Sequence, residues 1–539
     1  MNVLQHSSDL CITNLRLKFA GESSFIFKDL SFVVPQGQKI LLLGPSGCGK
    51  STLLQVLSGI IPTSIEVPMK ADSIQKPDSW GFVFQDPDTQ FCMPMVDEEL
   101  AFVLENLSVP REQMKARMIS VLEMVGLHLD LNELHVPIQS FSQGMKQRLA
   151  LATVLLLNPE VLFLDEPSAL LDPDGTMQIW EAIKYVASEK TVIIVEHKIE
   201  HVISYVDRVV LFNDKGEIIA DDTPDFVFSN NKDELQQFGI WYPDVWQDYT
   251  QSNTYQTIMH EKNEKHLYNQ SPSIPTLSRK QPPLLWLHQF AGYREKQRRI
   301  YVREAAVHTG EWIAITGENG AGKSTFLLSL MQLLQTDGTY VIEGHSIVQA
   351  QSHRRKHTPP SQLAFVFQNP EMQFVTDSVY DEIAFALQLE KRPQVEIDRI
   401  VKGLLSSFHL HVSEDRHPYQ LSMGQKRRLS VASAIVQNQP VLLLDEPTFG
   451  LDAKSTFAIL ERLEQLRVSG VSILMITHDP HIVEYFCDHV WEIREGELSS
   501  ISKVKSSTAA TTSLYDANKD VDMAESHIIH SEAATERSK

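Results

Sequence analysis

Two short stretches of the chain carry the residue types of a phosphate-binding loop. Each matches G-x-x-x-x-G-K-[ST], follows an apolar run typical of a strand and precedes a run typical of a helix. In such a loop, backbone N–H groups and the helix N-terminus bind phosphate oxygens, the lysine neutralises phosphate charge, and the serine hydroxyl supplies one Mg²⁺ ligand. With the threonine that follows each, the predicted nucleotide-binding residues are Gly44-Pro45-Ser46-Gly47-Cys48-Gly49-Lys50-Ser51-Thr52 and Gly317-Glu318-Asn319-Gly320-Ala321-Gly322-Lys323-Ser324-Thr325. We therefore expect the chain to bind a nucleotide at two places.

An aspartate followed by a glutamate ends an apolar run in two further places. Asp165 and Glu166 follow residues 161–164, and Asp445 and Glu446 follow residues 441–444. Ligands of parallel sheets bind at the carboxyl ends of the strands, which is where these acids would lie. The aspartate would hold Mg²⁺, and the glutamate would act as general base for the water that attacks the γ-phosphate. Acidic residues can also cap a helix N-terminus, but the recurrence of the pair favours the catalytic interpretation.

These residues recur because one domain occurs twice. In each copy, short apolar runs alternate with longer amphipathic stretches, which is typical of an α/β domain with a buried parallel sheet. Five landmarks recur in the same order at a nearly constant spacing: Lys50 with Lys323, Gln85 with Gln368, Ser142 with Ser422, Asp165 with Asp445 and His197 with His478. The sequence therefore predicts two tandem α/β domains.

We place the first domain at residues 1–247 and the second at residues 284–505. Residues 248–283 are rich in Asn, Gln, Ser, Lys and Pro, which favours a flexible linker. Residues 506–539 are rich in Ser, Thr and Ala and contain few large apolar residues, so we expect them to be disordered. The aromatic stretch at 241–246 could be a docking surface or a terminal helix packed on its own domain, and we favour the second.

The composition is that of a soluble globular protein. Hydrophobic residues make up 42% and charged residues 22% of the 539 residues. No apolar run approaches the roughly 20 residues of a membrane helix, and the N-terminus lacks the pattern of a secretory signal. The four cysteines have no metal-binding or redox spacing, which favours a reducing cytoplasm. A net charge of −21 without a long Lys/Arg run argues against a nucleic-acid partner.

The order of these motifs resembles that of an ABC-type ATPase over nearly all of the chain outside the linker and tail. The first copy has the phosphate loop, Gln85, Phe141-Ser142-Gln143-Gly144-Met145, Asp165-Glu166, Ser168-Ala169-Leu170-Leu171-Asp172 and His197. The second copy has the phosphate loop, Gln368, Leu421-Ser422-Met423-Gly424-Gln425, Asp445-Glu446, Thr448-Phe449-Gly450-Leu451-Asp452 and His478. Residues 141–145 and 421–425 are called the signature segments below.

The resemblance implies a head-to-tail pseudo-dimer of two P-loop domains that binds ATP and Mg²⁺ at two shared sites. Each ATP would lie between the phosphate loop of one domain and the signature segment of the other. One site would combine Lys50, Ser51, Gln85, Asp165, Glu166 and His197 with Ser422 and Gly424. The other would combine Lys323, Ser324, Gln368, Asp445, Glu446 and His478 with Ser142 and Gly144. The expected Mg²⁺ ligands are Ser51, Gln85, Asp165, Ser324, Gln368 and Asp445, and the expected catalytic residues are Glu166, Glu446, His197, His478, Gln85 and Gln368.

Aromatic and signature residues add two finer expectations. Phe19 and Tyr293 lie upstream of the phosphate loops, where an aromatic residue of this family stacks on adenine; burial in the core is the alternative explanation. The signature segments depart from the usual Leu-Ser-Gly-Gly-Gln, since Gln143 and Met423 replace the first glycine and Met145 replaces the glutamine. We expect the site at the second phosphate loop, which uses the first signature segment, to be the weaker hydrolase.

The segments after the two glutamines resemble the ATPases of energy-coupling-factor importers of vitamins and metals. Both copies carry a Gln-Asx-Pro-acidic-x-Gln stretch, at 85–90 and 368–373, followed by an acidic segment that ends in Ala-Phe. In that family this region receives the coupling helices of a transmembrane subunit. Asp97, Glu98, Asp381 and Glu382 would suit basic helices, and a solvated acidic helix face is the alternative.

The resemblance also implies a place for the chain in the cell. It would be a peripheral protein on the cytoplasmic face of a bacterial membrane, with the transmembrane coupling subunit and the substrate-binding membrane subunit as separate chains. The fused arrangement is similar to the double ATPases for uptake of the thiamine precursor hydroxymethylpyrimidine, and cobalt or other vitamins stay open. A soluble twin-ABC translation factor is less expected because residues 250–283 lack a highly charged helical character. A DNA-repair ATPase would need coiled-coil or zinc-bearing insertions.

Overall fold

The computed structural model describes residues 10–19, 24–129, 134–169, 171–260, 282–347, 359–410 and 412–504. The tail at 506–539, expected to be disordered, and residues 261–281 of the expected linker lie outside these ranges. Within them, each copy forms a mixed α/β domain built around a parallel sheet, as predicted.

The first domain contains two sheets. A small antiparallel sheet pairs β1 (Leu10–Leu17) with β2 (Phe27–Val34), β4 (Met69–Lys70) and β5 (Ser73–Gln75). The larger sheet has the order β10-β9-β3-β8-β7-β6, with β3 (Lys39–Leu43), β6 (Trp80–Val83), β7 (Val161–Asp165), β8 (Thr191–Val195), β9 (Arg208–Phe212) and β10 (Ile218–Asp222). All of its pairs are parallel except β9 with β10. Every residue of β7 and β8 is buried, because helices and the small sheet cover both faces.

Helices pack against this sheet, and some of them form a helix-rich part of the first domain beside it. They are α1 (Lys50–Ser58), α2 (Ile60–Thr63), α3 (Val96–Asn106), α4 (Arg111–Met124), α5 (Gln143–Leu155), α6 (Pro173–Val186), α7 (Pro224–Asn230), α8 (Lys232–Phe238) and α9 (Val245–Gln251). Residues 253–260 are also helical. Helix α1 follows the first phosphate loop, and α5 follows the first signature segment.

In the second domain one sheet continues through all the strands. Its order is β15-β14-β11-β12-β20-β19-β13-β18-β17-β16. The strands are β11 (Leu285–Arg294), β12 (Gln297–Val307), β13 (Trp312–Thr316), β14 (Gln335–Ile342), β15 (His345–Ser346), β16 (Leu363–Val366), β17 (Val441–Asp445), β18 (Ser472–Ile476), β19 (His489–Arg494) and β20 (Glu497–Lys503). The helices are α11 (Lys323–Leu330), α12 (Val379–Leu389), α13 (Gln394–Ser407), α14 (Met423–Ala434), α15 (Ala453–Val468) and α16 (Pro480–Phe486).

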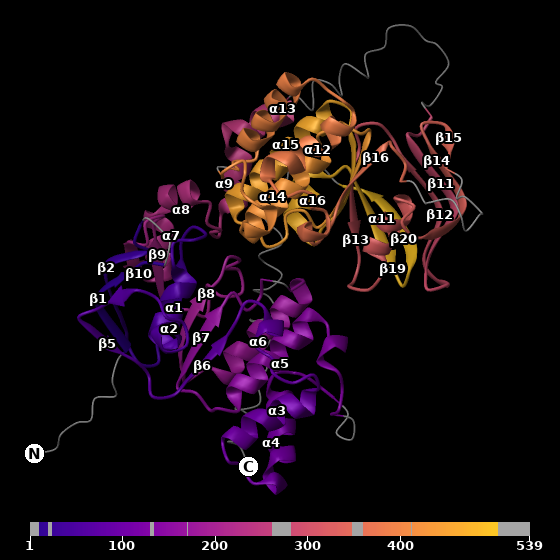
Figure 1. Ribbon diagram of the computed structural model, residues 1–539. Coiled ribbons are helices and arrows are strands. Elements are labelled where there is room, and N and C mark those ends of the chain that lie inside the picture. Colours follow the sequence, from indigo (N-terminus) through magenta and orange to yellow (C-terminus); the bar gives the residue numbers. More distant parts are fainter. Residues whose placement is uncertain are drawn as a thin grey trace, which may run out of the picture.

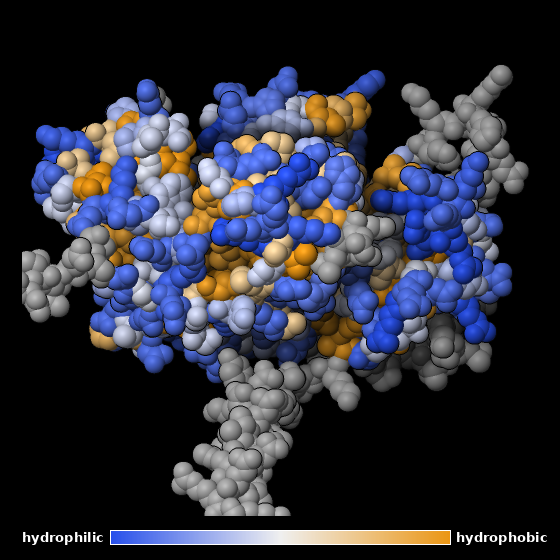
Figure 2. All heavy atoms as spheres, turned by 90° about the horizontal axis from the view of Figure 1, so that it is seen from below, coloured by the Kyte–Doolittle hydropathy of each residue, from blue (hydrophilic) through white to orange (hydrophobic). Residues whose placement is uncertain are grey.

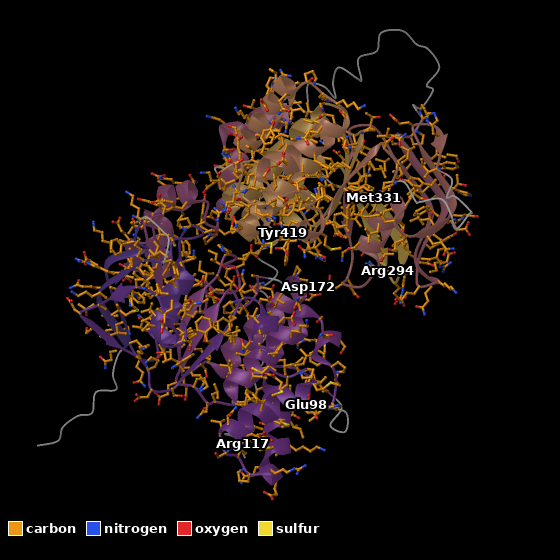
Figure 3. All side chains as sticks on the ribbon, in the orientation of Figure 1. Glu98, Arg117, Asp172, Arg294, Met331 and Tyr419 are labelled. Carbon is orange, nitrogen blue, oxygen red and sulfur yellow. The ribbon has the colours of Figure 1, made fainter. Side chains whose placement is uncertain are left out.

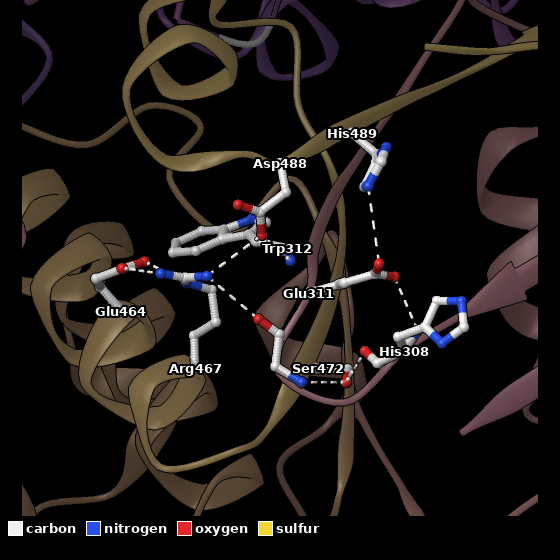
Figure 4. Close-up of polar contacts among 9 residues, drawn as sticks. His308, Glu311, Trp312, Glu464, Arg467, Ser472, Asp488 and His489 are labelled. Atoms are coloured by element: carbon white, nitrogen blue, oxygen red, sulfur yellow. Dashed lines mark hydrogen bonds and ion pairs between the residues drawn. The ribbon is translucent and has the colours of Figure 1, made fainter. Parts of the chain in front are cut away.

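A buried ion-pair network joins α15 to the starts of β13 and β19 (Figure 4). The Arg467 guanidinium donates to the Glu464 carboxylate at 2.6 and 2.9 Å and reaches Asp488 at 3.3 Å. Asp488 in turn accepts a hydrogen bond from the backbone N–H of Trp312 at 2.9 Å. The network fixes the end of the sheet that lies opposite the nucleotide-binding edge.

The two domains lie head to tail (Figure 1). In this view the strand-rich parts of the two domains lie at opposite ends of the molecule, and their helix-rich parts lie one above the other between them. The Asn319 side-chain amide, in the second phosphate loop, donates a hydrogen bond to the Asp172 carboxylate of the first domain. Asp172 lies at the top of the first domain's helical part, facing the second domain (Figure 3).

The end of the first domain differs from its prediction. Helix α9 lies among the helices of the second domain (Figure 1), and residues 248–260, which the sequence assigns to a flexible linker, are largely helical. Trp241, Trp246 and Tyr249 are buried, and they do not pack on their own domain as we expected. Trp246 and Tyr249 instead pack on Phe457 of α15, with ring centroids 5.0 and 3.8 Å away. The sequence singled out the aromatic stretch at 241–246 but assigned Tyr249 to the linker, because the burial of this ring outweighs the polarity of its neighbours.

Candidate functional site

Both phosphate loops are shaped by the lysine side chain and by glycine. Lys50 is buried, and its ammonium group donates to the carbonyl oxygens of Gly44 and Pro45 at 2.6 and 3.1 Å. Lys323 donates in the same way to Gly317 and Glu318 at 2.7 and 2.9 Å. The loops therefore have one geometry in both copies.

The start of α1 offers free backbone donors to an anion. Its N-cap, Gly49, has a φ of 103° and supplies no side-chain cap, and the first turn contains no acidic residue. A Cβ at Gly49 would lie 2.6 Å from Cγ2 of Ile26, so the position accepts only glycine. Gly322 occupies the same position before α11, with a φ of 108°. The N-terminal N–H groups of both helices can thus bind phosphate oxygens.

In the first copy, the predicted magnesium and catalytic residues lie together at the carboxyl end of β7. The Ser51 hydroxyl donates to the Asp165 carboxylate at 2.8 Å. The Glu166 carboxylate accepts a hydrogen bond from the Gln85 amide at 2.7 Å, and its other oxygen lies 3.0 Å from Nε2 of His197. The sequence prediction that these five residues share one site is consistent with this geometry.

The ionisation of these groups follows from their burial and their neighbours. Burial raises the pKa of Asp165 to about 6, although the Ser51 hydroxyl lowers it in part. Burial opposes ionisation of Glu166 and His197 as well, but their mutual contact outweighs it, so the pKa of Glu166 is lowered and that of His197 is raised. Glu166 is therefore held as a carboxylate next to the histidine.

The second copy repeats the arrangement with looser contacts. Nε2 of His478 lies 3.4 Å from the Glu446 carboxylate, and Gln368, like Gln85, is exposed in the loop after its strand. Burial raises the pKa of Asp445 to about 6. Both glutamates that are predicted to be catalytic have left-handed backbones, with φ of 50° at Glu166 and 49° at Glu446. Such strain in a residue with a side chain is typical of functional sites.

The oxygen donors of both copies fit Mg²⁺, a hard cation that takes carboxylate, hydroxyl and carbonyl oxygens. One carboxylate oxygen of Asp445, Oδ1, is buried without a hydrogen-bond partner. A buried carboxylate oxygen without a partner is costly unless a cation or donor satisfies it. The Ser, Gln and Asp set predicted in each copy is therefore chemically suited to the ion.

The signature segments start α5 and α14. The Ser142 hydroxyl accepts from the backbone N–H of Met145 at 3.2 Å. The Ser422 hydroxyl accepts from Gln425 at 3.3 Å, and the Gln425 side chain accepts from the Ser422 N–H at 3.0 Å, which completes a capping box. Gly144 and Gly424 lie in the first turns of the two helices. Among the described residues, no hydrogen bond joins a signature segment to the phosphate loop of the other domain.

The aromatic residues proposed for adenine stacking are half-buried. Phe19 packs against the hydrophobic cluster of the first strand-rich part, and Tyr293 lies near the end of β11. Both are accessible in part, so stacking on adenine stays a prediction.

A cavity of about 340 Å³ lies between the two domains and contains the catalytic pairs of both. Residues 168–172 and 448–452, called the D-loops below, face each other across it. The site residues that line it are Glu166, His197, Glu446 and His478. The two sites are therefore adjacent, and both D-loops lie between them.

Two buried charged residues near the sites were missed by the sequence prediction. Glu196 precedes His197, and its carboxylate accepts from the backbone N–H groups of Ser168 and His197, each at 3.0 Å, and from the Ser168 hydroxyl. Burial raises the pKa of Glu196 to about 7. Arg427 of α14 donates to the main-chain oxygen of Glu446. Comparing the copies could have found both, because Thr477 and Gln147 hold the corresponding positions.

Comparison with known proteins agrees with this geometry. Residues 27–169 and 304–449 match the family model described as ABC transporter. The Bacillus subtilis (strain 168) protein named "Putative HMP/thiamine import ATP-binding protein YkoD" is 32% identical, covering 91% of this chain and 90% of that protein. A "Putative ABC transporter ATP-binding protein" of Methanosarcina acetivorans is 30% identical, covering 87% of this chain and 82% of that protein.

A solved structure shares the tandem fold. The archaeal ribosome recycling factor aABCE1, in complex with the ribosomal stalk protein aP1, matches with a TM-score of 0.59 at 19% identity, over 90% of this chain and 88% of that chain. At this identity the likeness concerns the fold alone. With two matched domains, two phosphate loops of one geometry and relatives of similar length at 30% identity or more, the chain belongs to the ABC transporter family and is a tandem ATPase.

Proposed function

We propose that this ATPase is the energy-coupling subunit of an energy-coupling-factor importer for a vitamin, a vitamin precursor or a metal ion. The favoured cargo is hydroxymethylpyrimidine or thiamine, because the relative from Bacillus subtilis carries that name. The observation that carries the proposal is a tie, present in both copies, between an exposed loop and the helix that bears the signature segment.

The tie consists of an ion pair and an amide hydrogen bond in each copy. Asp88 pairs with Lys146 of α5 at 2.7 Å, and Glu371 pairs with Lys426 of α14. The side-chain amides of Gln90 and Gln373 donate to carbonyl oxygens of the same two helices at 3.0 and 2.7 Å. A partner that moves the loop would therefore move the helix that begins with the signature segment.

The surface around these loops is apolar where a partner helix could bind. In the second copy Met372 and Val375 are 70% and 68% exposed, and Phe385 of α12 is 41% exposed. Phe102 of α3 is the corresponding exposed residue of the first copy. Figure 2, seen from the side of α3 and α4 of the first domain, shows hydrophobic residues among polar ones on that face of the molecule. An amphipathic coupling helix of a transmembrane subunit fits such a surface.

The acidic residues expected to receive this helix are only partly available. Glu382 is buried and accepts hydrogen bonds from the backbone N–H groups of Val375 and Thr376, so the expectation is wrong for this residue. Asp381 is bonded to the Ser378 hydroxyl at 2.7 Å, and Asp97 lies 3.0 Å from His135. Glu98, labelled in Figure 3, is exposed. Docking would therefore depend on apolar contact more than on charge.

At each site the proposed roles follow from position. The lysine and the helix N-terminus bind the β- and γ-phosphates, and the glutamate, held as a carboxylate by histidine, takes the proton of the attacking water. The histidine and glutamine orient the γ-phosphate and the water. Ser51, Asp165 and Gln85, and their counterparts Ser324, Asp445 and Gln368, would hold Mg²⁺, which supplies neutralisation of phosphate charge when bound.

We place the protein on the cytoplasmic face of the membrane, bound to a transmembrane coupling subunit and a substrate-binding subunit. None of the helices in the described ranges is long and apolar enough to cross a bilayer. A cobalt or other vitamin importer is the first alternative. A translation factor is the second, and the aABCE1 structure supports it through fold only.

Affinity purification from detergent-solubilised membranes tests the proposal. The wild-type chain should retain membrane proteins, and Val375→Asp should release them while basal ATPase activity is kept. Val395→Asp is the matched control, because Val395 is 81% exposed on α13, away from the tied loop. Purification with ribosomal RNA and without membrane proteins would overturn the proposal. Uptake of labelled hydroxymethylpyrimidine compared with labelled cobalt then distinguishes the cargoes.

A further inference from the structure

The first domain holds the D-loop of the second domain through residues 239–260, called the cross-domain segment below. The indole N–H of Trp241 donates to the carbonyl oxygen of Leu451 at 2.8 Å. The backbone N–H of Ala453 donates to the carbonyl oxygen of Gly239 at 2.9 Å. These two hydrogen bonds flank Asp452, the last residue of the second D-loop and the N-cap of α15.

Close approach at Gly239 depends on the absence of a side chain. Gly239 has a φ of 69°, and a Cβ there would lie 2.5 Å from the Cβ of Lys454. The segment is anchored beyond this point by the rings of Trp246 and Tyr249 on Phe457, and by a hydrogen bond of 3.3 Å from the Tyr255 hydroxyl to the Tyr485 carbonyl. The contact is therefore a built interface and not an incidental touch between domains.

The D-loop that is held in this way faces the catalytic residues of the first domain. Gly450 and Leu451 line the same cavity as Glu166 and His197, and Trp241 lines it as well. A Cβ at Gly450 would lie 3.7 Å from the carbonyl oxygen of Ala169 in the first D-loop. A displacement of Leu451 therefore changes the wall of the cavity next to the first catalytic pair.

We propose that Trp241 is a positioning residue for ATP hydrolysis at the site of Glu166. The cross-domain segment of the first domain positions the D-loop of the second domain, and this D-loop faces the nucleotide site of the first domain. The first D-loop meets the second domain differently, through the hydrogen bond between Asp172 and Asn319. Loss of the Trp241 hydrogen bond should therefore affect one site more than the other. This inference rests on the proposed roles of Glu166 and Glu446 as general bases.

Trp241→Phe removes the indole donor and keeps an aromatic ring in the cluster. The variant is made in two backgrounds, Glu446→Gln, in which the site of Glu166 is active, and Glu166→Gln, in which the site of Glu446 is active. In the first background, kcat should fall about fivefold with KM for ATP unchanged, because one buried hydrogen bond of ordinary strength is lost. In the second background, kcat should change less than twofold.

Trp180→Phe is the control for the loss of a buried indole, because Trp180 is buried on α6, outside the cross-domain segment, and its indole N–H has no hydrogen-bond partner. It should lower the melting temperature as much as Trp241→Phe does and leave both single-site rates unchanged. Gly239→Ala should reproduce the site-selective loss by pushing the segment away from Lys454. Equal losses in both backgrounds, or a change in KM alone, would overturn the inference. If Glu166→Gln and Glu446→Gln fail by themselves to lower ATPase activity, the assignment of the bases fails instead.

Discussion

Restoring a capping box at the first signature segment should accelerate ATP hydrolysis at the weaker site. Ser422 and Gln425 form both hydrogen bonds of this motif, whereas Met145 cannot accept the bond from the Ser142 N–H. The start of α5 therefore has one fixed hydrogen bond fewer than the start of α14. Because we propose that the first signature completes the site of the second phosphate loop, that site would have the less rigid donor set. Met145→Gln supplies the missing acceptor.

The expected magnitude follows from one hydrogen bond. A hydrogen bond of this kind contributes about 1 kcal/mol to helix capping. If all of it serves to orient the signature for the transition state, the rate rises about fivefold. The reverse substitution, Gln425→Met, should lower the rate at the site of Glu166 by a similar factor.

The assay is steady-state ATPase activity in single-site backgrounds. Met145→Gln is measured with Glu166→Gln, and Gln425→Met is measured with Glu446→Gln. Met145→Leu is the control for side-chain shape without a hydrogen-bond acceptor and should have no effect. A rate that is unchanged by Met145→Gln, or raised equally by Met145→Leu, would refute the reasoning. A greater activity loss from Glu446→Gln than from Glu166→Gln would show that the site of Glu446 is not the weaker one.

Three further outcomes are expected. Arg467→Met should lower the free energy of unfolding, measured in urea, by about 3–5 kcal/mol, because it leaves a buried carboxylate without its partner. Arg16→Met, at an exposed position, should change the free energy of unfolding little. Equal losses in the two variants would contradict the prediction. Because burial raises the pKa of Glu196 to about 7 from its ordinary 4.5, the folded state binds a proton that the unfolded state has released, and stability falls as the pH rises through this window. Between pH 4.5 and pH 8, the free energy of unfolding of the Glu196→Gln variant should therefore fall by roughly 3 kcal/mol less than that of the wild type. Parallel profiles of unfolding free energy against pH would exclude the effect. Cysteines at 172 and 319 should form a disulfide within one chain of 61.1 kDa, and a covalent dimer would show that two chains exchange domains.

The sequence predicted the parts of the site that depend on local motifs. A glycine-rich loop between a buried strand and a helix has few possible shapes, so the positions of Lys50 and Lys323 followed from the spacing alone. Acidic residues at the ends of buried strands lie at the same sheet edge, which brought Asp165 and Glu166 next to Ser51, Gln85 and His197, as expected. The head-to-tail pairing required the resemblance to a family, because no local pattern specifies how two domains meet.

The parts that failed depend on partners far away in the chain. Trp241 hydrogen-bonds to Leu451, and Tyr249 stacks on Phe457. No local sequence pattern at residues 241–260 predicts these contacts. Composition predicted a flexible linker at residues 248–283 because it averages over neighbours and cannot weigh a few buried rings. Glu382 was misjudged for the same reason, since an acidic helix start looks solvated until the loop that it caps is in place.

The differences between the copies extend from one site to the other. Glu196 bonds the backbone of His197 at the first site and Ser168 of the first D-loop, and Asp172 of that D-loop bonds Asn319 in the second phosphate loop. In the second copy Thr477 stands in place of Glu196, and its hydroxyl accepts from the backbone of Asp479 instead. Within the described residues, hydrogen bonds of Glu196 and Asp172 therefore connect the first D-loop to the first catalytic pair and to the second phosphate loop, and Thr477 makes no corresponding bond to the second D-loop. We infer that a second link, between the second D-loop and the first catalytic pair, depends on Trp241. Reciprocity constrains the binding affinities of the two sites but not their kcat values. Because the two links are made by different residues, Glu196→Thr should change kcat at the site of Glu446, measured in the Glu166→Gln background, more than Trp241→Phe does.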